Sequence, residues 1–220
     1  MASKKRSSTT STPPAKKVVN TPKATAQLAD RKPARRGSQK AKLLSSKLVY
    51  KGNIFSVYRD HVTEPGNITS YRDVVRHAGS VVVLAVDDSL DPTDPLVVVE
   101  RQYRHAAGQY LLELPVGKLD KGETPLQGAK REMIEETGYT AKKWKKLVRY
   151  YPSPGYVGEW MEIYLATQIV EGDAQPEEDE RIEVRMMPLS TLVKMIKAGK
   201  IHDGKMIIGI LTYAAQLQKA

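Results

Sequence analysis

The chain has 220 residues, 40% of them hydrophobic and 27% charged, enough for one ordinary domain or a small domain beside a medium one. No stretch reaches the roughly 18–20 uninterrupted apolar residues of a membrane-spanning helix, and the first residues lack the apolar block of a secretory signal. The absence of cysteine excludes disulfides, a thiolate nucleophile and cysteine-ligated metal centres. These features fit a reducing compartment, and we expect a cytoplasmic protein with no membrane partner.

The net charge of +10 is concentrated at the N-terminus. Residues 1–45 carry 12 Lys and Arg and one acid, a net of +11, which leaves 23 bases against 24 acids in residues 46–220. Residues 1–45 contain no aromatic residue, and their burial cannot offset about 1–2 kcal/mol of backbone entropy per residue. We therefore predict a disordered basic tail over 1–45. Its composition suits a solubilising extension, attraction to nucleic acid or acidic surfaces, or an organelle transit peptide.

Strand and helix patterns alternate after the tail. Short alternating segments and a turn at 65–67 predict short strands within residues 46–78. The run SVVVLAV at 80–86 is typical of a strand buried on both faces. Without strict βαβ regularity, the remaining pattern favours a mixed sheet flanked by helices, an α/β (α+β) domain over 79–220. Further strands are predicted over 96–100, 146–151, 162–166 and 181–187, and helices over 125–137, 189–198 and 207–217.

Local signals bound the helix predicted over 125–137. Thr124 can cap its first turn, Pro125 suits the first helical position, and Gln127 completes a capping box. Gly138 stands where a left-handed residue commonly ends a helix.

Three carboxylates border the apolar stripe of this helix, namely Glu132, Glu135 and Glu136. Like charges at such spacing repel one another, and hard oxygen donors at i, i+3 and i+4 suit Mg²⁺ or Mn²⁺, which neutralise that repulsion. The alternative is an exposed acidic helix whose carboxylates pair with Lys130 and Arg131.

The spacing around these carboxylates resembles the consensus of the Nudix hydrolases. The pattern runs from Gly117 over five residues to Glu123, over seven more to Arg131-Glu132-Met133, and on to Glu135-Glu136 and Gly138-Tyr139. The resemblance implies a Nudix α/β/α sandwich around a mixed sheet, with a small N-terminal antiparallel sheet. It also implies hydrolysis of a nucleoside diphosphate linked to another group.

The metal-binding roles of the family carry over to matching positions. Glu132 and Glu136 resemble the principal ligands of Mg²⁺, for which Mn²⁺ can substitute, and Glu135 resembles a further ligand or its neighbour. The backbone carbonyl of Val116 resembles another ligand. The remaining residues of the box would hold its loop and helix together, with Arg131 paired to Glu123 and Glu135: Gly117, Glu123, Arg131 and Gly138.

Segments beside the box resemble the ADP-ribose pyrophosphatase branch of the family. LLELPVG at 111–117 resembles its ELPAG approach, QYR at 102–104 its QxR, and SPG at 153–155 its proline-containing element. Taken alone, SPG is an ordinary turn, Arg72 a surface charge and Phe55 a core residue. The resemblance implies these substrate-binding candidates, with Arg72 reaching the partner subunit: Phe55, Arg72, Arg104, Glu113, Pro154 and Glu159.

The acidic loop QPEEDERIEV at 175–184 offers a general base. A solvated loop is the alternative, but the family places its base and an additional metal-binding glutamate here. The match makes Glu178 the candidate base and Glu180 the candidate metal ligand, with a slip of one or two residues open. The catalytic candidates are thus Glu178, Glu180 and Glu135.

The sequence thus predicts a Mg²⁺-dependent enzyme that splits ADP-ribose or a related ADP-sugar into AMP and a sugar phosphate. The resemblance also implies a homodimer in which the segment 46–78 is exchanged between subunits. Two alternatives stay open. The substrate could be another nucleotide, such as GDP-mannose or a dinucleoside polyphosphate, or the protein could be associated with nucleic acid through its tail and carry a vestigial box.

Overall fold

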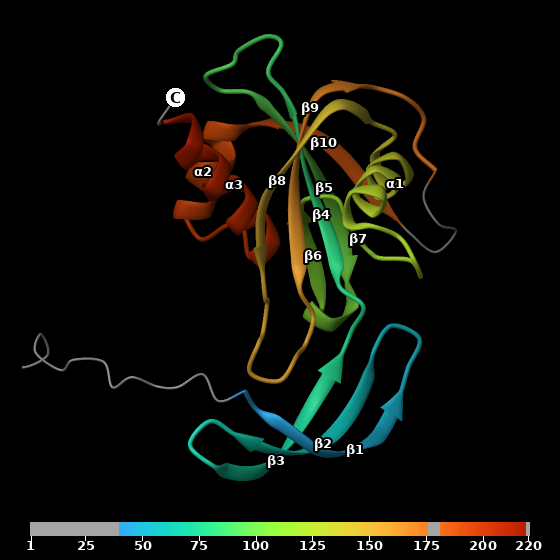
Figure 1. The fold of residues 1–220 in the computed structure, drawn as a ribbon. Coiled ribbons are helices and arrows are strands. Elements are labelled where there is room, and N and C mark those ends of the chain that lie inside the picture. Colours follow the sequence, from blue (N-terminus) through green and yellow to red (C-terminus); the bar gives the residue numbers. More distant parts are fainter. Residues whose placement is uncertain (1–39, 176–180, 219–220) are drawn as a thin grey trace, which may run out of the picture. The chain divides into compact units, whose positions relative to one another are not determined.

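A computed structural model describes residues 40–175 and 181–218 (Figure 1). No helix in these two ranges has the length and apolar character needed to cross a membrane. The helices are α1 (Pro125–Thr137), α2 (Leu189–Lys197) and α3 (Gly204–Leu217), beside a short 3-10 turn at His105–Ala107. The strands are β1 (Lys42–Lys51), β2 (Ser56–Glu64), β3 (Ile68–Arg76), β4 (Ser80–Asp87), β5 (Leu96–Arg104), β6 (Gln109–Glu113), β7 (Val116–Lys118), β8 (Thr140–Tyr150), β9 (Met161–Val170) and β10 (Ile182–Pro188).

The strands form two sheets. The small sheet has the antiparallel order β1-β2-β3, and the large sheet follows the order β10-β5-β4-β9-β8, with β6 paired to β5 and β7 paired to β4. Strands β4 and β9 run parallel, whereas the other pairs of the large sheet are antiparallel. The predicted mixed sheet and small N-terminal antiparallel sheet are therefore confirmed.

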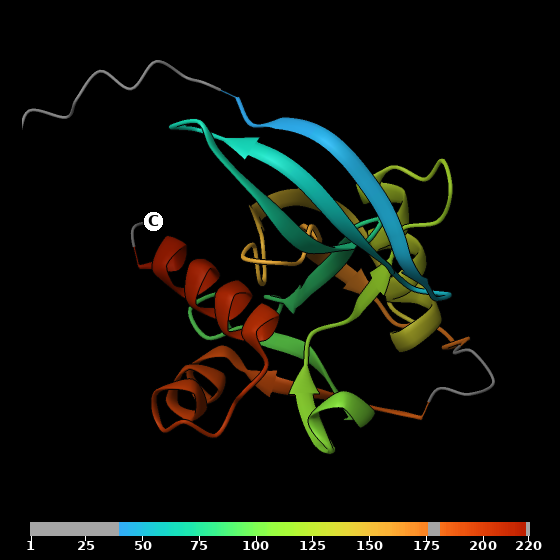
Figure 2. The same ribbon diagram turned by 90° about the horizontal axis from the view of Figure 1, so that it is seen from below.

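The central strand β4 separates two hydrophobic layers. Alternate side chains beginning at Val81 pack with Ala129 and Met133 of α1, whereas those beginning at Val82 pack toward α2 and α3. Every residue from Val81 to Val86 has an exposed fraction of 0%, which confirms the strand predicted to be buried on both faces. Helices consequently cover both faces of the large sheet, and the fold is an α/β/α sandwich (Figure 2).

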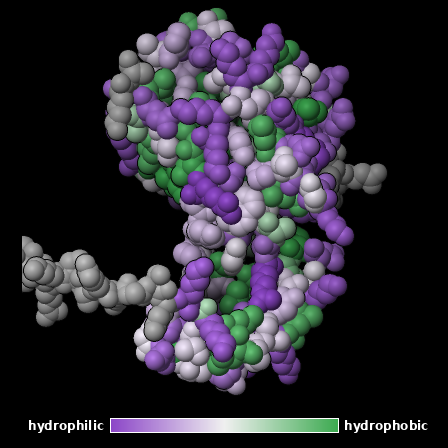
Figure 3. Space-filling view, viewed as in Figure 1, coloured by the Kyte–Doolittle hydropathy of each residue, from purple (hydrophilic) through white to green (hydrophobic). Residues whose placement is uncertain are grey.

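The small sheet exposes much of its apolar surface. All ten residues of β1 are exposed, and apolar side chains appear on the visible face of this sheet (Figure 3). The tail was predicted to extend over residues 1–45, but strand β1 already begins at Lys42. Residues 1–39 of the predicted tail lie outside the described ranges. The large exposed side chains are Leu43, Leu44, Leu48, Val49, Tyr50, Ile54, Phe55, Ile68 and Tyr71.

The helices lie close to their predicted bounds. Helix α1 begins and ends as predicted, and α2 ends one residue early. Helix α3 begins at Gly204 rather than at Ile207, because the carboxylate of Asp203 caps it by accepting a hydrogen bond from the backbone N–H of Met206 at 2.8 Å.

Candidate active site

Helix α1 presents the acidic residues in a fixed orientation because both of its ends are capped. The backbone N–H of Thr124 donates to the Gln127 side chain at 2.9 Å, and the Gln127 N–H donates back to Thr124 Oγ1 at 3.4 Å. At the other end, Gly138 adopts φ 76° and its N–H donates to the Ile134 carbonyl at 2.9 Å. The predicted capping box and left-handed C-cap are both confirmed.

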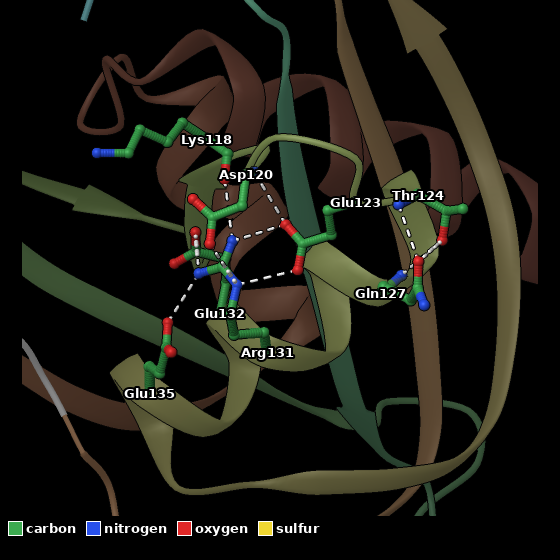
Figure 4. A network of polar contacts seen from close by, with 8 residues as sticks. All are labelled: Lys118, Asp120, Glu123, Thr124, Gln127, Arg131, Glu132 and Glu135. Carbon is green, nitrogen blue, oxygen red and sulfur yellow. Dashed lines mark hydrogen bonds and ion pairs between the residues drawn. The ribbon is translucent and has the colours of Figure 1, made fainter. Parts of the chain in front are cut away.

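Arg131 joins the helix to the loop that precedes it (Figure 4). Its guanidinium donates to both carboxylate oxygens of Glu123 at 3.0 Å and to the carbonyl of Lys118 at 3.0 Å. It also donates to Glu132 and to Glu135, at 2.8 Å each. Hydrogen bonding from Arg131 lowers the pKa of Glu123, and Glu123 in turn raises the pKa of Arg131. The contacts that the resemblance implied for Arg131 are present.

Two buried carboxylates of α1 lie against the same short backbone segment. The Val116 N–H donates to Glu136 Oε2 at 2.8 Å. A Cβ at the next residue, Gly117, would lie 1.7 Å from the carboxylate carbon of Glu132, so only glycine leaves room for this side chain. The exposed fractions of Glu132 and Glu136 are 9% and 4%. These two side chains therefore converge on Val116 and Gly117 and do not form an exposed acidic face.

This arrangement suits a divalent cation. Carboxylate and carbonyl oxygens are the ligands that Mg²⁺ prefers, and two carboxylates lie here beside one backbone segment. The described residues hold no group of three or more Asp, Glu or His side chains close enough to bind a metal ion; Glu135 instead bonds to Arg131. A third carboxylate ligand would have to come from elsewhere, and the candidates Glu178 and Glu180 lie outside the described residues.

A second charged cluster joins β5, β6 and α3. Arg104 forms a bidentate pair with Glu113, at 2.8 and 2.9 Å, and Glu113 is only 1% exposed. Lys205 donates to the same carboxylate and to Asp203 Oδ2, the latter at 2.7 Å. Burial raises the pKa of Glu113, but Arg104 and Lys205 outweigh it, so this pKa lies below its ordinary value.

This cluster lies within electrostatic range of the box. Hydrogen bonding to Glu113 raises the pKa of Arg104, and the charge of Glu136 adds to the effect. Arg104 and Glu113 were predicted from the sequence, whereas Asp203 and Lys205 were not. The available signal was local, since an aspartate directly before a helix is a common N-cap and a lysine two residues later can reach it.

Asp203 and Lys205 also line a cavity of about 360 Å³. Glu159, a predicted substrate-binding residue, lies on its wall and accepts a hydrogen bond from Ser80 Oγ at 2.6 Å. Pro154 is exposed in the neighbouring turn, whereas Pro152 lines the cavity. The structure thus brings Glu159 near the second charged cluster.

Two predicted residues lie on the small sheet or its connections. Phe55 is 42% exposed and its ring lies 5.9 Å from that of Tyr50. Arg72 pairs with Glu64 of the β2–β3 hairpin, at 2.6 and 3.1 Å. Among the described residues of this single chain, neither side chain has a hydrogen bond, ion pair or ring contact to a box residue, and their roles at a partner's site stay predictions.

The comparison with protein families agrees with this geometry. The NUDIX domain model matches residues 76–208. The chain therefore belongs to the NUDIX domain family and is a Nudix hydrolase, a class of enzymes that generally uses divalent metals.

Relatives named for two activities are similar over most of the chain. The ADP-ribose pyrophosphatase of Bacillus subtilis (strain 168) is 34% identical over 188 residues, covering 83% of this chain and 99% of that protein. The ADP-ribose pyrophosphatase of Mycobacterium tuberculosis is 36% identical over 175 residues, covering 78% and 82%. The GDP-mannose pyrophosphatase of Citrobacter koseri is 33% identical over 192 residues, covering 80% and 95%. A crystal structure described as an ADP compounds hydrolase shares the fold, with a TM-score of 0.69 at 20% identity over 82% of this chain and 96% of that one.

Proposed function

We propose that this protein hydrolyses the diphosphate of ADP-ribose, or of a related ADP-sugar, to AMP and a sugar phosphate, with Mg²⁺ as its metal and Mn²⁺ as a substitute. The convergence of Glu132 and Glu136 on Val116 and Gly117 carries the proposal, because it places buried oxygen donors where a diphosphate-bound cation can be held. Relatives named ADP-ribose pyrophosphatase support the choice of substrate.

The charged side chains divide the work of binding and chemistry. A bound divalent cation would neutralise the diphosphate and help to activate water. Arg131 holds Glu132 in place and keeps the loop against α1. Glu113 occupies Nε and Nη2 of Arg104, so further N–H groups of this guanidinium are available to a phosphate oxygen. Lys205 adds a second positive charge beside the same carboxylate.

The reaction needs a group that takes the proton of the attacking water. The water oxygen bonds to one phosphorus, the bridging P–O bond breaks, and two phosphate monoesters leave. We assign the proton to Glu178 and a metal-binding role to Glu180, because in this proposal Glu132 and Glu136 bind the metal. A base on a loop can approach when substrate is bound, which couples binding to chemistry.

The small sheet supports a homodimer. Its exposed apolar side chains include Leu48, Val49 and Tyr50 on β1, together with Ile68 and Tyr71 on β3, and contiguous exposed apolar surface commonly marks an interface. We infer that a second copy covers this sheet, which would allow Phe55 and Arg72 to serve the partner's site. Light scattering of the purified chain should give twice the mass of the 24.5 kDa monomer, and a monomer at micromolar concentration would contradict this inference.

A substrate panel tests the proposal. ADP-ribose, other ADP-sugars, GDP-mannose and a dinucleoside polyphosphate are incubated with Mg²⁺, with Mn²⁺ and with chelator, and the products are separated by chromatography. We expect AMP from ADP-ribose in both metals and no product with chelator. Absence of AMP would overturn the substrate assignment. The relative named GDP-mannose pyrophosphatase makes GDP-mannose the second candidate, and GMP as the dominant product would select it.

Glu136→Gln tests the metal assignment. The variant keeps an oxygen that can accept the Val116 N–H, so the fold should persist, whereas loss of the negative charge should abolish metal-dependent turnover. Activity equal to that of the parent would contradict the assignment of Glu136.

A further inference from the structure

Strand β8 carries a concentration of positive charge outside the site described above. Its eleven residues include no acid, while residues 46–220 as a whole have a net charge of −1. Hydrophilic side chains cover the region of this strand in the space-filling view (Figure 3). All five basic residues are exposed: Lys142, Lys143, Lys145, Lys146 and Arg149.

Two of these bases have partners within the domain. Lys146 donates to Glu162 at 2.5 Å, and Arg149 lies 3.5 Å from the same carboxylate and 4.1 Å from the centre of the Trp160 ring. The other three, Lys142, Lys143 and Lys145, make no ion pair within residues 40–175 and 181–218. Their positive charges are therefore not compensated by carboxylates of these two ranges.

The strand combines this charge with a groove. Lys143 and Lys145 project from one face of β8, opposite Thr167 and Leu165 of β9 in the strand register. These four residues and Trp144 line a groove of about 500 Å³. Strand β8 also ends the path of the large sheet (Figure 1), so no further strand of the described chain covers its outer edge.

We propose that β8 and its groove bind single-stranded nucleic acid through the phosphate backbone. Lysines two residues apart on a strand are about 6.6 Å apart, which is the separation expected for Lys143 and Lys145. Proteins that bind single strands combine positive charge with an aromatic or apolar surface for the bases, and the half-buried Leu165 lies on the face of the sheet that carries Lys143 and Lys145. The basic N-terminal segment has a net charge of +11 over residues 1–45, and this positive charge would also attract the phosphates.

The observations favour nucleic acid over an anionic membrane. No large exposed hydrophobic residue lies on the described strand β8, and a surface without apolar anchors has nothing to insert into lipid. For a hydrated chain of regularly spaced phosphates, the lysines supply the positive charge, and Leu165 in the groove supplies an apolar contact for a base.

The test measures binding of the full chain to a fluorescently labelled oligo-dT of about twelve nucleotides across about 50–200 mM salt. The variant Lys143→Gln/Lys145→Gln is compared with Lys194→Gln/Lys197→Gln, which removes the same charge from exposed positions of α2. Each lost phosphate contact should reduce the slope of log K against log salt by about 0.7, hence by about 1.4 for two. If the β8 variant and the parent bind equally at 1 M salt, this change of slope makes the variant bind about 25-fold more weakly than the parent at 0.1 M salt.

We expect this loss for the β8 variant alone, with thermal unfolding and ADP-ribose turnover unchanged. An equal loss in both variants would show that total charge or the N-terminal segment binds without β8, and no loss in either would likewise overturn the proposal. Vesicles containing about 30% phosphatidylserine form the other arm. Binding to them that depends on Lys143 and Lys145, without binding to the oligonucleotide, would replace nucleic acid by a membrane.

Discussion

Adding one carbon at Gly117 should disable the active site. A Cβ there would lie 1.7 Å from both Cδ and Oε1 of Glu132 and 2.2 Å from Oε2, whereas real Cβ atoms essentially never approach within 3.0 Å. Gly117→Ala must therefore displace either the Glu132 carboxylate or strand β7. Since Glu132 is only 9% exposed and bonds to Arg131, both movements disrupt packed and hydrogen-bonded structure.

The expected cost follows from this overlap. Inserting a methyl group into a packed site commonly costs about 1–3 kcal/mol. For a domain of this size the melting temperature should then fall by about 2–12 °C, at about 2–4 °C per kcal/mol. Turnover should fall about as far as it does in Glu132→Gln, because the displaced carboxylate leaves its place beside Glu136.

A double-mutant cycle separates this clash from other causes. Denaturant unfolding in the presence of chelator is measured for the parent, Gly117→Ala, Glu132→Ala and the double variant. Gly117→Ala should cost almost nothing once the Glu132 side chain is removed, which gives a coupling free energy of about 1–3 kcal/mol. Gly155→Ala is the matched control, since a Cβ there meets nothing within 4 Å, and its effect should stay within about 0.5 kcal/mol. Equal costs of Gly117→Ala in both backgrounds would refute the reasoning.

Three further predictions address the proposed base, the second charged cluster and acid stability. Glu178→Gln should lower kcat by about 10²–10⁴-fold with metal affinity unchanged, whereas Glu180→Gln should mainly weaken metal binding; the reverse result would exchange the two roles. Arg104→Lys cannot reproduce the bidentate pair with Glu113, so kcat/KM should fall by about 10- to 150-fold. Kinetics equal to those of the parent would show that Arg104 does not bind the substrate. Burial raises the pKa of Glu162, but hydrogen bonds from Lys146 and Tyr164 outweigh it and place this pKa below 4.5. The ionised Glu162 thus stabilises the fold above pH 4.5, and this stabilisation is lost as the pH falls. Between about pH 5 and pH 3, Glu162→Gln should therefore lose less free energy of unfolding than the parent. Identical pH profiles of the two proteins would contradict this role of Glu162.

The bounds of α1 could be predicted because its signals are local. Thr124, Pro125, Gln127 and Gly138 each act within one helical turn, and all four occupy their expected positions. The burial of β4 follows in the same way from a continuous β-branched run. Such features depend on the chain within a few residues and need no knowledge of tertiary contacts.

The extent of the strands depends on their neighbours. Strand β8 begins at Thr140 rather than at 146, because pairing with β9 continues through a lysine-rich segment that shows no hydrophobic alternation. Strands β6 and β7 were not predicted, since five and three residues give too little pattern, and they form by pairing with β5 and β4. Tertiary pairing therefore decides these elements.

The candidate site was predicted where its residues are close in sequence and missed where they are distant. Ninety-two residues separate Lys205 from Glu113, and a lysine that follows a helix cap has no local mark of its partner. The pairing arises because α3 packs on the face of the sheet that also bears β6. The spacing of the box, in contrast, specifies Glu123 and Arg131 within eight residues.

The protein itself compensates much of the acidic charge on α1. The clustering of carboxylates is therefore a weaker argument for a bound metal than it is from the sequence alone. Repulsion among clustered carboxylates is one reason to expect a cation, yet Arg131 bonds to Glu132 and Glu135, and Glu136 accepts the N–H of Val116. We therefore expect a metal to be required for chemistry but not for folding. Chelator should abolish turnover while leaving one cooperative unfolding transition, and Mg²⁺ at about 100 times its Kd should add about 2.7 kcal/mol. If chelator alone unfolds the chain at 25 °C, as followed by circular dichroism, these contacts do not suffice to hold the acidic helix in place.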